Sequence, residues 1–246
     1  GLTPVTLLDL LVSGRVIEYS LTLVEGWNFR EVLEAVREHP VIVDTLPAEA
    51  TASDVMALLG HPDEHPEGRF FPDTYLFPRD TTDVQFLMRA FERMDTILED
   101  EWEQRAAELP LKDSYEALIL ASIIEKETGR ADERTEIAGV FIRRLRKGML
   151  LQTDPTVIYG LGDSFDGNLR RRDLEADNPY NTYRRAGLTP TPIAMPGRDA
   201  IHAALHPADG DALYFVAKGD GSHQFSATLG EHNRAVRRYQ LKGGNR

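Results

Sequence analysis

Residues 118–160 read LILASIIEKETGRADERTEIAGVFIRRLRKGMLLQTDPTVIYG, and this segment decides how the chain folds. Its first part, Leu118 to Ile124, is apolar on every side of a helix except at Ser122, which is typical of a buried helix. The apolar run ends abruptly in the triplet Glu-Lys-Glu that begins at Glu125. We therefore expect Glu125 to stand where a buried helix leaves the core.

The sequence also indicates where this helix begins and ends. Asp113 and Glu116 have the spacing of a capping box, so the helix is predicted to begin near Ser114, and Gly129 is placed to end it. A second helix is predicted through residues 137–145. The stretch LLQTDPTVIYG that follows it is predicted to be a polar loop.

A carboxyl group at the position of Glu125 is partly desolvated and lies near the negative end of the helix dipole. Both effects favour its protonated form, whereas Lys126 acts in the opposite direction. A neutral carboxylic acid is what glycoside cleavage needs to protonate the leaving oxygen. The same triplet is also compatible with a solvated helix end, and helical spacing alone does not choose between Glu125 and Glu127.

The rest of the chain predicts an α+β protein in which helices predominate. Residues 70–78, FFPDTYLFP, are rich in aromatic side chains, for which core packing is favoured over a sugar cleft. Residues 162–196 are turn-rich and are predicted to form an ordered loop region. The other predicted elements are a helix over 3–14, a strand over 16–24, a helix over 29–39 capped by Asn28, helix and loop connections over 46–67, a long amphipathic helix over 82–102, a hairpin over 213–228 and a terminal helix over 231–240.

Composition excludes several functions. The formal net charge of -12 over 246 residues argues against nucleic-acid binding, because phosphate contacts need a basic face. There is no cysteine, which removes disulfides and thiolate chemistry. His202 and His206 have a chelating spacing on a predicted helix, but no third ligand is evident in the sequence, so no metal site is expected.

Four ordered motifs resemble one family. They are ASIIEKET, VFIRRLRKGMLLQTDPTVIYG, NPYNTYRRAGLTPTPIAMPG and LYFVAKGDGSHQFSATLGEHN, and the likeness extends upstream through LVEGWNFREVL and FFPDTYLFPRDTT. Together they resemble the endolytic murein transglycosylases of the YceG-like (MltG) family over nearly the whole chain. The resemblance implies a helix-rich, lysozyme-like catalytic domain with β-hairpin elements over residues 26–246. Residues 1–25 resemble the C-terminal part of a LysM-like subdomain.

The resemblance also implies site residues. It assigns the catalytic role to the first glutamate of the triplet, Glu125. Leu151-Gln152 resembles a Met-Gln motif of lysozyme-like transglycosylases, and Tyr180-Asn181 resembles their Tyr-Asn motif. The expected substrate-binding residues are Gln152, Thr153, Tyr159 and Asn181, with Glu127 in a supporting role.

The implied reaction cleaves the β-1,4 bond between N-acetylmuramic acid and N-acetylglucosamine in peptidoglycan strands. Glu125 would protonate the glycosidic oxygen and then accept the proton of the C6 hydroxyl, which gives a 1,6-anhydromuramoyl end. No metal or organic cofactor is implied. The expected partners are glycan strands and cell-wall synthases, in a role that terminates or processes nascent strands. The basic groups at residues 143–147, 170–172 and 184–185 are either solvated or contact the carboxylates of stem peptides.

Two departures from the family pattern stand out. Thr189 and Met195 occupy loop positions where a proline and a small or polar residue are expected. Family members begin with a cytoplasmic tail, one membrane-spanning helix and a LysM-like subdomain, whereas no apolar run here approaches the roughly 20 residues that a bilayer requires. We expect the chain to be the extracytoplasmic part of a single-pass protein of the cell inner membrane, without its anchor.

Two other functions remain open at the level of sequence. In a hydrolytic muramidase, a second carboxylate such as Asp154 or Asp173 would activate water. In a non-catalytic glycan-binding scaffold of the cell-wall synthesis machinery, Glu125 would be structural.

Overall fold

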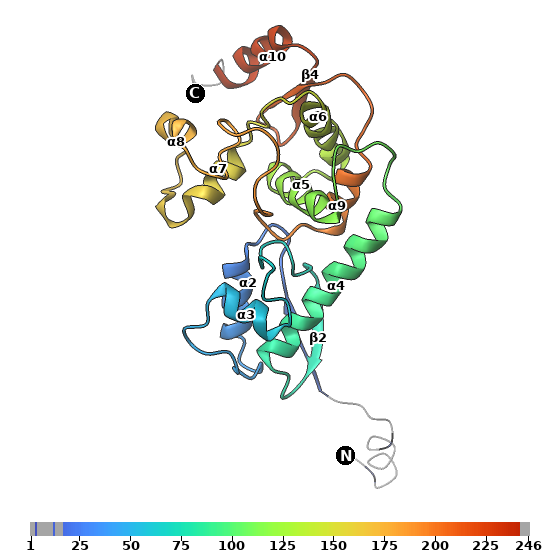
Figure 1. Ribbon diagram of the computed structural model, residues 1–246, viewed down its shortest axis with the longest axis vertical. Helices are drawn as coiled ribbons and strands as arrows, with labels where there is room; N and C mark the ends of the chain where they lie inside the picture. The colour runs from blue at the N-terminus through green and yellow to red at the C-terminus, as the bar shows by residue number, and fades with distance from the viewer. Residues whose placement is uncertain (1–2, 4–11, 13–16, 242–246) are drawn as a thin grey trace.

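The computed structural model describes residues 3, 12 and 17–241, so most of the helix predicted over residues 3–14 lies outside the described part (Figure 1). Residues 17 to about 100 form a lower lobe, and the rest of the described chain forms an upper lobe (Figure 1). Helix α4 (Asp83–Glu103) runs from one lobe into the other (Figure 1). Thr82 caps α4 through a capping box with Gln85, so the long helix predicted there is confirmed.

The lower lobe packs two short helices and a two-stranded sheet against the first half of α4. Strands β1 (Glu18–Thr22) and β2 (Thr74–Pro78) are antiparallel, with Glu18 opposite Pro78. The helices are α2 (Phe29–Glu38) and α3 (Ala52–Leu58), and Asn28 caps α2 as predicted. The strand predicted over residues 16–24 is therefore confirmed as β1.

In the aromatic segment over residues 70–78, Phe70, Tyr75 and Phe77 belong to the core of this lobe, whereas Phe71 packs in the core of the upper lobe. Phe70, Phe71, Tyr75 and Phe77 are all buried, and Tyr75 and Phe77 point to the same side of β2. Phe86 lies edge-on to both of those rings, at 5.3 and 5.5 Å between centroids. Core packing, rather than a sugar cleft, is the role that these rings have.

The upper lobe is built around α5 (Ser114–Glu127). Every residue from Ala117 to Ile124 is buried, because α4, α6 (Arg134–Arg146), α7 (Asp154–Leu161) and α9 (Arg198–Leu205) all pack against α5. The Asp113 side chain accepts the backbone N–H of Glu116, so the predicted helix start is confirmed.

The polar loop predicted over residues 150–160 is corrected by the structure. Its second half is helix α7, which starts at Asp154 with Pro155 in the first turn, where proline costs a helix no hydrogen bond. Between α7 and residue 197 the chain forms a 3₁₀ turn at 162–164, the short helix α8 (Arg171–Glu175) and irregular structure, as the turn-rich sequence predicts. Another 3₁₀ turn, at 131–133, directly precedes α6.

A β-hairpin and a terminal helix close the upper lobe. Strands β3 (Tyr214–Ala217) and β4 (His223–Ser226) pair antiparallel, and α10 (Leu229–Val236) continues into a π-helical turn at Arg237–Leu241. The α+β class with predominant helices is confirmed. No helix in the described part of the chain has the length and hydropathy to cross a membrane.

The two lobes are joined by backbone as well as by α4. The N–H of Gly26 donates to the carbonyl oxygen of Met195 at 2.8 Å, and the N–H of Met195 donates to that of Trp27 at 2.7 Å. Met195, one of the departures from the family pattern, is fully buried in the core of the lower lobe. Thr189, the other departure, is also buried, and its hydroxyl donates to the carbonyl oxygen of Thr191 at 2.8 Å.

Close packing of α6 gives a stability prediction. A Cβ at Gly139 would lie 2.5 Å from the carbonyl oxygen of Ala208, which is backbone and cannot rotate away. Gly139→Ala should therefore lower the free energy of unfolding by about 1–3 kcal/mol, measured by urea denaturation. Gly230→Ala in α10 is the control, since its Cβ would lie 3.7 Å from Arg234 Nη1, an ordinary contact, and it should be neutral or slightly stabilising. Equal effects of the two substitutions would contradict this packing.

Candidate active site

The two glutamates at the end of α5 have different surroundings. Glu125 Oε2 accepts the backbone N–H of Gly197 at 3.0 Å, and Oε1 lies 3.5 Å from Arg134 Nη2. Both carboxylate oxygens of Glu125 are thus engaged. Burial raises the pKa of Glu125, and the Gly197 N–H and Arg134 oppose this rise.

Arg134 is the centre of an ion-pair network between the lobes. Its Nη1 lies 3.1 Å from Asp199 Oδ2, and its Nη2 lies 3.9 Å from Glu25 Oε2. Glu25 comes from the lower lobe, directly after β1, and a Cβ at Gly197 would collide with its side chain. Glu125 therefore belongs to a network that holds the lobes together.

Glu127 faces a pocket of about 420 Å³ on the other side of α5. Burial raises the pKa of Glu127 to about 7, although the Thr153 hydroxyl donates to its Oε1 and favours the ionised form. Among the described residues, none makes a hydrogen bond to the second oxygen, Oε2. Glu127 thus has one oxygen held by the protein and one available to a ligand.

The segment before α7 holds Thr153 in place. Gln152 has a φ of 52°, in the left-handed region, and its N–H donates to the carbonyl oxygen of Thr182 at 3.1 Å. The N–H of Thr153 donates to the Thr182 hydroxyl oxygen at 3.1 Å. Thr153 is buried, so it orients Glu127, whereas the exposed side chain of Gln152 lines the pocket.

Further residues of this pocket were not predicted as a group. Tyr183 donates to Asp154 Oδ1 at 2.5 Å, and the Nδ1 of His223 lies 2.7 Å from Glu133 Oε2. His232 stacks on a tyrosine of β3, and its Nδ1 is buried without a hydrogen-bond partner in the described part of the chain. Both histidines come from the last family-like motif, but only the fold brings that motif to Glu127.

Two predicted binding residues do not reach the Glu127 pocket. The Tyr159 hydroxyl donates to Glu67 Oε2 at 2.9 Å and lines a different pocket between the lobes. Asn181 has no exposed surface, and its amide donates to the carbonyl oxygens of Asp173, Leu174 and Ala176. In this arrangement Asn181 shapes the loop after α8, and its contact with substrate stays a prediction.

The basic groups identified in the sequence have two different kinds of surroundings. Arg143 and Arg144 donate to backbone carbonyl oxygens at residues 150–151, 208 and 212–213, which fixes both guanidinium groups. Arg143 is half-buried, and Arg144 also lines the Glu127 pocket. Arg170, Arg171 and Arg185 form ion pairs with neighbouring carboxylates at the surface.

The structure also brings a third group to the histidine pair. Ligand atoms of Glu101, His202 and His206 all lie within 4.8 Å of one another, a proximity that the sequence did not reveal. His202 Nδ1 lies 2.8 Å from Glu101 Oε2, and His206 Nε2 lies 2.9 Å from the carbonyl oxygen of Gln104. These contacts tie the end of α4 to α9.

A partly buried carboxyl group with one free oxygen, in a pocket lined by polar side chains, is the kind of site that acid–base enzymes use. The family comparison agrees with the motifs that surround it. The YceG-like family model matches residues 1–238, and the chain belongs to this family.

Three relatives illustrate the membership. The chain is 42% identical over 177 residues to the endolytic murein transglycosylase of Bacillus subtilis (strain 168), which covers 72% of this chain and 49% of that protein. It is 29% identical over 211 residues to the endolytic murein transglycosylase of Streptococcus pneumoniae (strain D39), covering 83% and 36%. A crystal structure of a putative YceG-like protein from Listeria monocytogenes matches with a TM-score of 0.71 and 30% identity, over 94% of this chain and 80% of that one. The chain thus spans half or less of the length of these two curated relatives.

The raised pKa of Glu127 predicts how stability changes with pH. Because the folded state holds this proton to about pH 7, above the range of an unfolded glutamate, the free energy of unfolding should fall as pH rises from about 5 to 8. Glu127→Gln should remove a part of this fall on the order of 2 kcal/mol. Urea denaturation across this pH range measures it, and parallel pH curves for the two proteins would contradict the raised pKa.

Proposed function

We propose that this chain is the catalytic part of a peptidoglycan lytic transglycosylase, which cleaves the β-1,4 bond between N-acetylmuramic acid and N-acetylglucosamine within glycan strands. Family membership and the names of the two curated relatives support this proposal. The observation that carries it is the free oxygen of Glu127, in a pocket where burial raises the pKa of that carboxyl group to about 7.

We assign the proton transfer to Glu127, two residues after the glutamate that the resemblance indicates. Both oxygens of Glu125 are engaged by Gly197 and Arg134, in a network that joins the lobes. Glu127 lies with Gln152 in one pocket, whereas Glu125 does not line that pocket. A general acid must reach the atom that it protonates, and this requirement favours Glu127.

In the proposed reaction, the proton on Glu127 Oε2 passes to the glycosidic oxygen as its bond to C1 of the muramic residue breaks. The acetamido group of that residue stabilises the cationic C1, which explains how one carboxyl group suffices. The C6 hydroxyl oxygen then bonds to C1 and gives its proton to the Glu127 carboxylate. The products are a 1,6-anhydromuramoyl end and a free 4-hydroxyl, and no water is consumed.

The neighbouring residues have supporting roles in this scheme. The Thr153 hydroxyl holds Oε1 of Glu127, so Oε2 is directed to substrate. Gln152 is available to bind sugar hydroxyls or an acetamido group.

A hydrolytic muramidase is the second candidate, and one observation favours it. Asp154 lines the same pocket as Glu127 and could activate water, whereas Asp173 accepts the backbone N–H of Arg170 away from that pocket. In a scaffold without catalysis, neither Glu127 nor Asp154 would take part in cleavage, and no new glycan ends would form.

The remaining features of the family are part of the same proposal. They are a lysozyme-like arrangement of the catalytic lobe, a LysM-like origin of residues 1–25, and a place on the extracytoplasmic side of the inner membrane through an N-terminal anchor. The proposal also includes cooperation of this protein with cell-wall synthases in ending nascent strands.

Glu127→Gln should abolish cleavage of purified glycan strands, because glutamine is nearly isosteric but transfers no proton. The expected loss is at least about 10²-fold. Glu125→Gln is the matched control on the same helix end and should retain a clearly measurable rate, with lower stability from the weakened network. Circular dichroism checks the fold of both variants. An inactive Glu125→Gln beside an active Glu127→Gln would return the catalytic role to Glu125.

Digestion in ¹⁸O-labelled water separates the transglycosylase from the hydrolase. The new muramoyl ends should be 1,6-anhydro and free of label, because the C6 hydroxyl is the nucleophile. Mass spectrometry of the products distinguishes the two reactions. Labelled reducing ends would establish hydrolysis, and the absence of new ends would favour the scaffold.

A further inference from the structure

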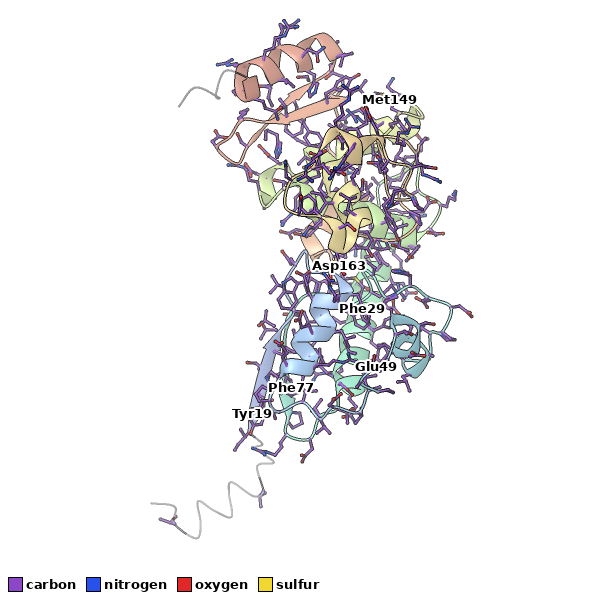
Figure 2. All side chains as sticks on the ribbon, turned by 90° about the vertical axis from the view of Figure 1, so that its left-hand side faces the viewer. Tyr19, Phe29, Glu49, Phe77, Met149 and Asp163 are labelled. Atoms are coloured by element: carbon purple, nitrogen blue, oxygen red, sulfur yellow. The ribbon has the colours of Figure 1, made fainter. Side chains whose placement is uncertain are left out.

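A second and larger pocket, of about 820 Å³, lies at the waist between the two lobes. Phe29 at the start of α2 lines its lower side, and Asp163, just after α7, lines its upper side. Figure 2 shows these two residues near each other at the waist. Arg30 forms an ion pair with Asp163 and so links the two sides.

The lining of this waist pocket suits a sugar. Tyr159, Phe165 and Ile158 contribute apolar surface from the upper lobe, and aromatic faces of this kind stack on pyranose rings. Lys126 and Glu67 add polar groups. The pocket has the size and the mainly apolar, sparsely polar lining of ligand sites in general.

Glu67 is not a second proton carrier in this pocket. Burial raises its pKa to about 7, like that of Glu127, but both oxygens are engaged. Oε1 accepts the N–H of Phe29 at 3.0 Å, and Oε2 accepts the Tyr159 hydroxyl at 2.9 Å. Glu67 therefore fixes the Tyr159 ring and joins the lobes at the base of the pocket.

Residues that are neighbours in sequence line the waist pocket and the Glu127 pocket at two places. Lys126 lines the waist pocket, and the next residue, Glu127, lines the other. Asp154 lines the Glu127 pocket, and the next residue, Pro155, lines the waist pocket. Consecutive Cα atoms are about 3.8 Å apart, so the linings of the two pockets come close along the backbone at the end of α5 and the start of α7.

We infer that the waist pocket is a second saccharide site, which holds N-acetylated β-1,4-linked sugars of the strand that Glu127 cleaves. This inference rests on the proposed function for its choice of ligand. The neighbouring residues that line the two pockets and the ring faces at the waist favour a sugar of the same strand over an unrelated small molecule.

The test fills the pocket without touching the Glu127 site. Ala52, at the exposed start of α3, lines the waist pocket, whereas Ala57 is exposed on the same helix and does not line it. Ala52→Trp and Ala57→Trp are made in the Glu127→Gln background, so that binding is measured without cleavage. The probe is N-acetylchitohexaose, and calorimetry gives its affinity. Ala52→Trp should weaken binding about tenfold or more, and Ala57→Trp should leave it within about twofold of the parent.

Phe165→Ala gives an independent measurement by removing one ring. It should weaken binding of the same probe by roughly three- to tenfold, which is the loss of affinity expected when one aromatic contact is removed. Unchanged affinity in both Ala52→Trp and Phe165→Ala, or no binding of the probe by the parent, would overturn the inference. Cleavage by the Glu127→Gln parent would instead overturn the assignment of the acid and leave the binding result intact.

Discussion

The burial of α5 on all sides is the constraint on which the rest of the structure depends. From Ala117 to Ile124 the helix touches only protein, and its one polar side chain in that stretch, Ser122, donates to the carbonyl oxygen of Ile119 at 2.7 Å and accepts the N–H of Ile193 at 3.0 Å. A carboxyl group that follows directly on such a helix cannot be fully hydrated. The raised pKa values at its end are thus a consequence of the same packing that forms the core.

One helix end serves two purposes because residues two apart point in different directions. Glu125 and Glu127 are separated by roughly 200° around the helix axis. Glu125 therefore pairs with Arg134, which links it to the lower lobe, and Glu127 enters the pocket beside the β3–β4 hairpin. The ion network holds the lobes, and the position of the lobes in turn defines the waist pocket. Lobe packing and acid chemistry are thus linked through a single turn of helix.

Local signals in the sequence predicted most of the helices and the hairpin, because caps and apolar periodicity act over a few residues. The predicted capping residues Asn28 and Asp113 stand where the structure has its helix starts. Helix α7 was missed because Thr, Asp and Pro also form turns. The candidate site was predicted less well, since the choice between two glutamates, the burial of Asn181 and the pairing of Tyr159 with Glu67, 92 residues away, depend on tertiary contacts.

The central claim is that burial keeps the carboxyl group of Glu127 protonated near neutral pH while one oxygen stays free. Carbon-detected NMR of protein labelled with ¹³C at the glutamate carboxyl groups measures this directly, and the Glu127→Gln variant assigns the signal. The account predicts a carboxyl resonance that titrates near pH 7 in the parent protein and is missing from Glu127→Gln. A resonance lost in that variant that titrates below about pH 5, as for a solvated glutamate, would contradict it.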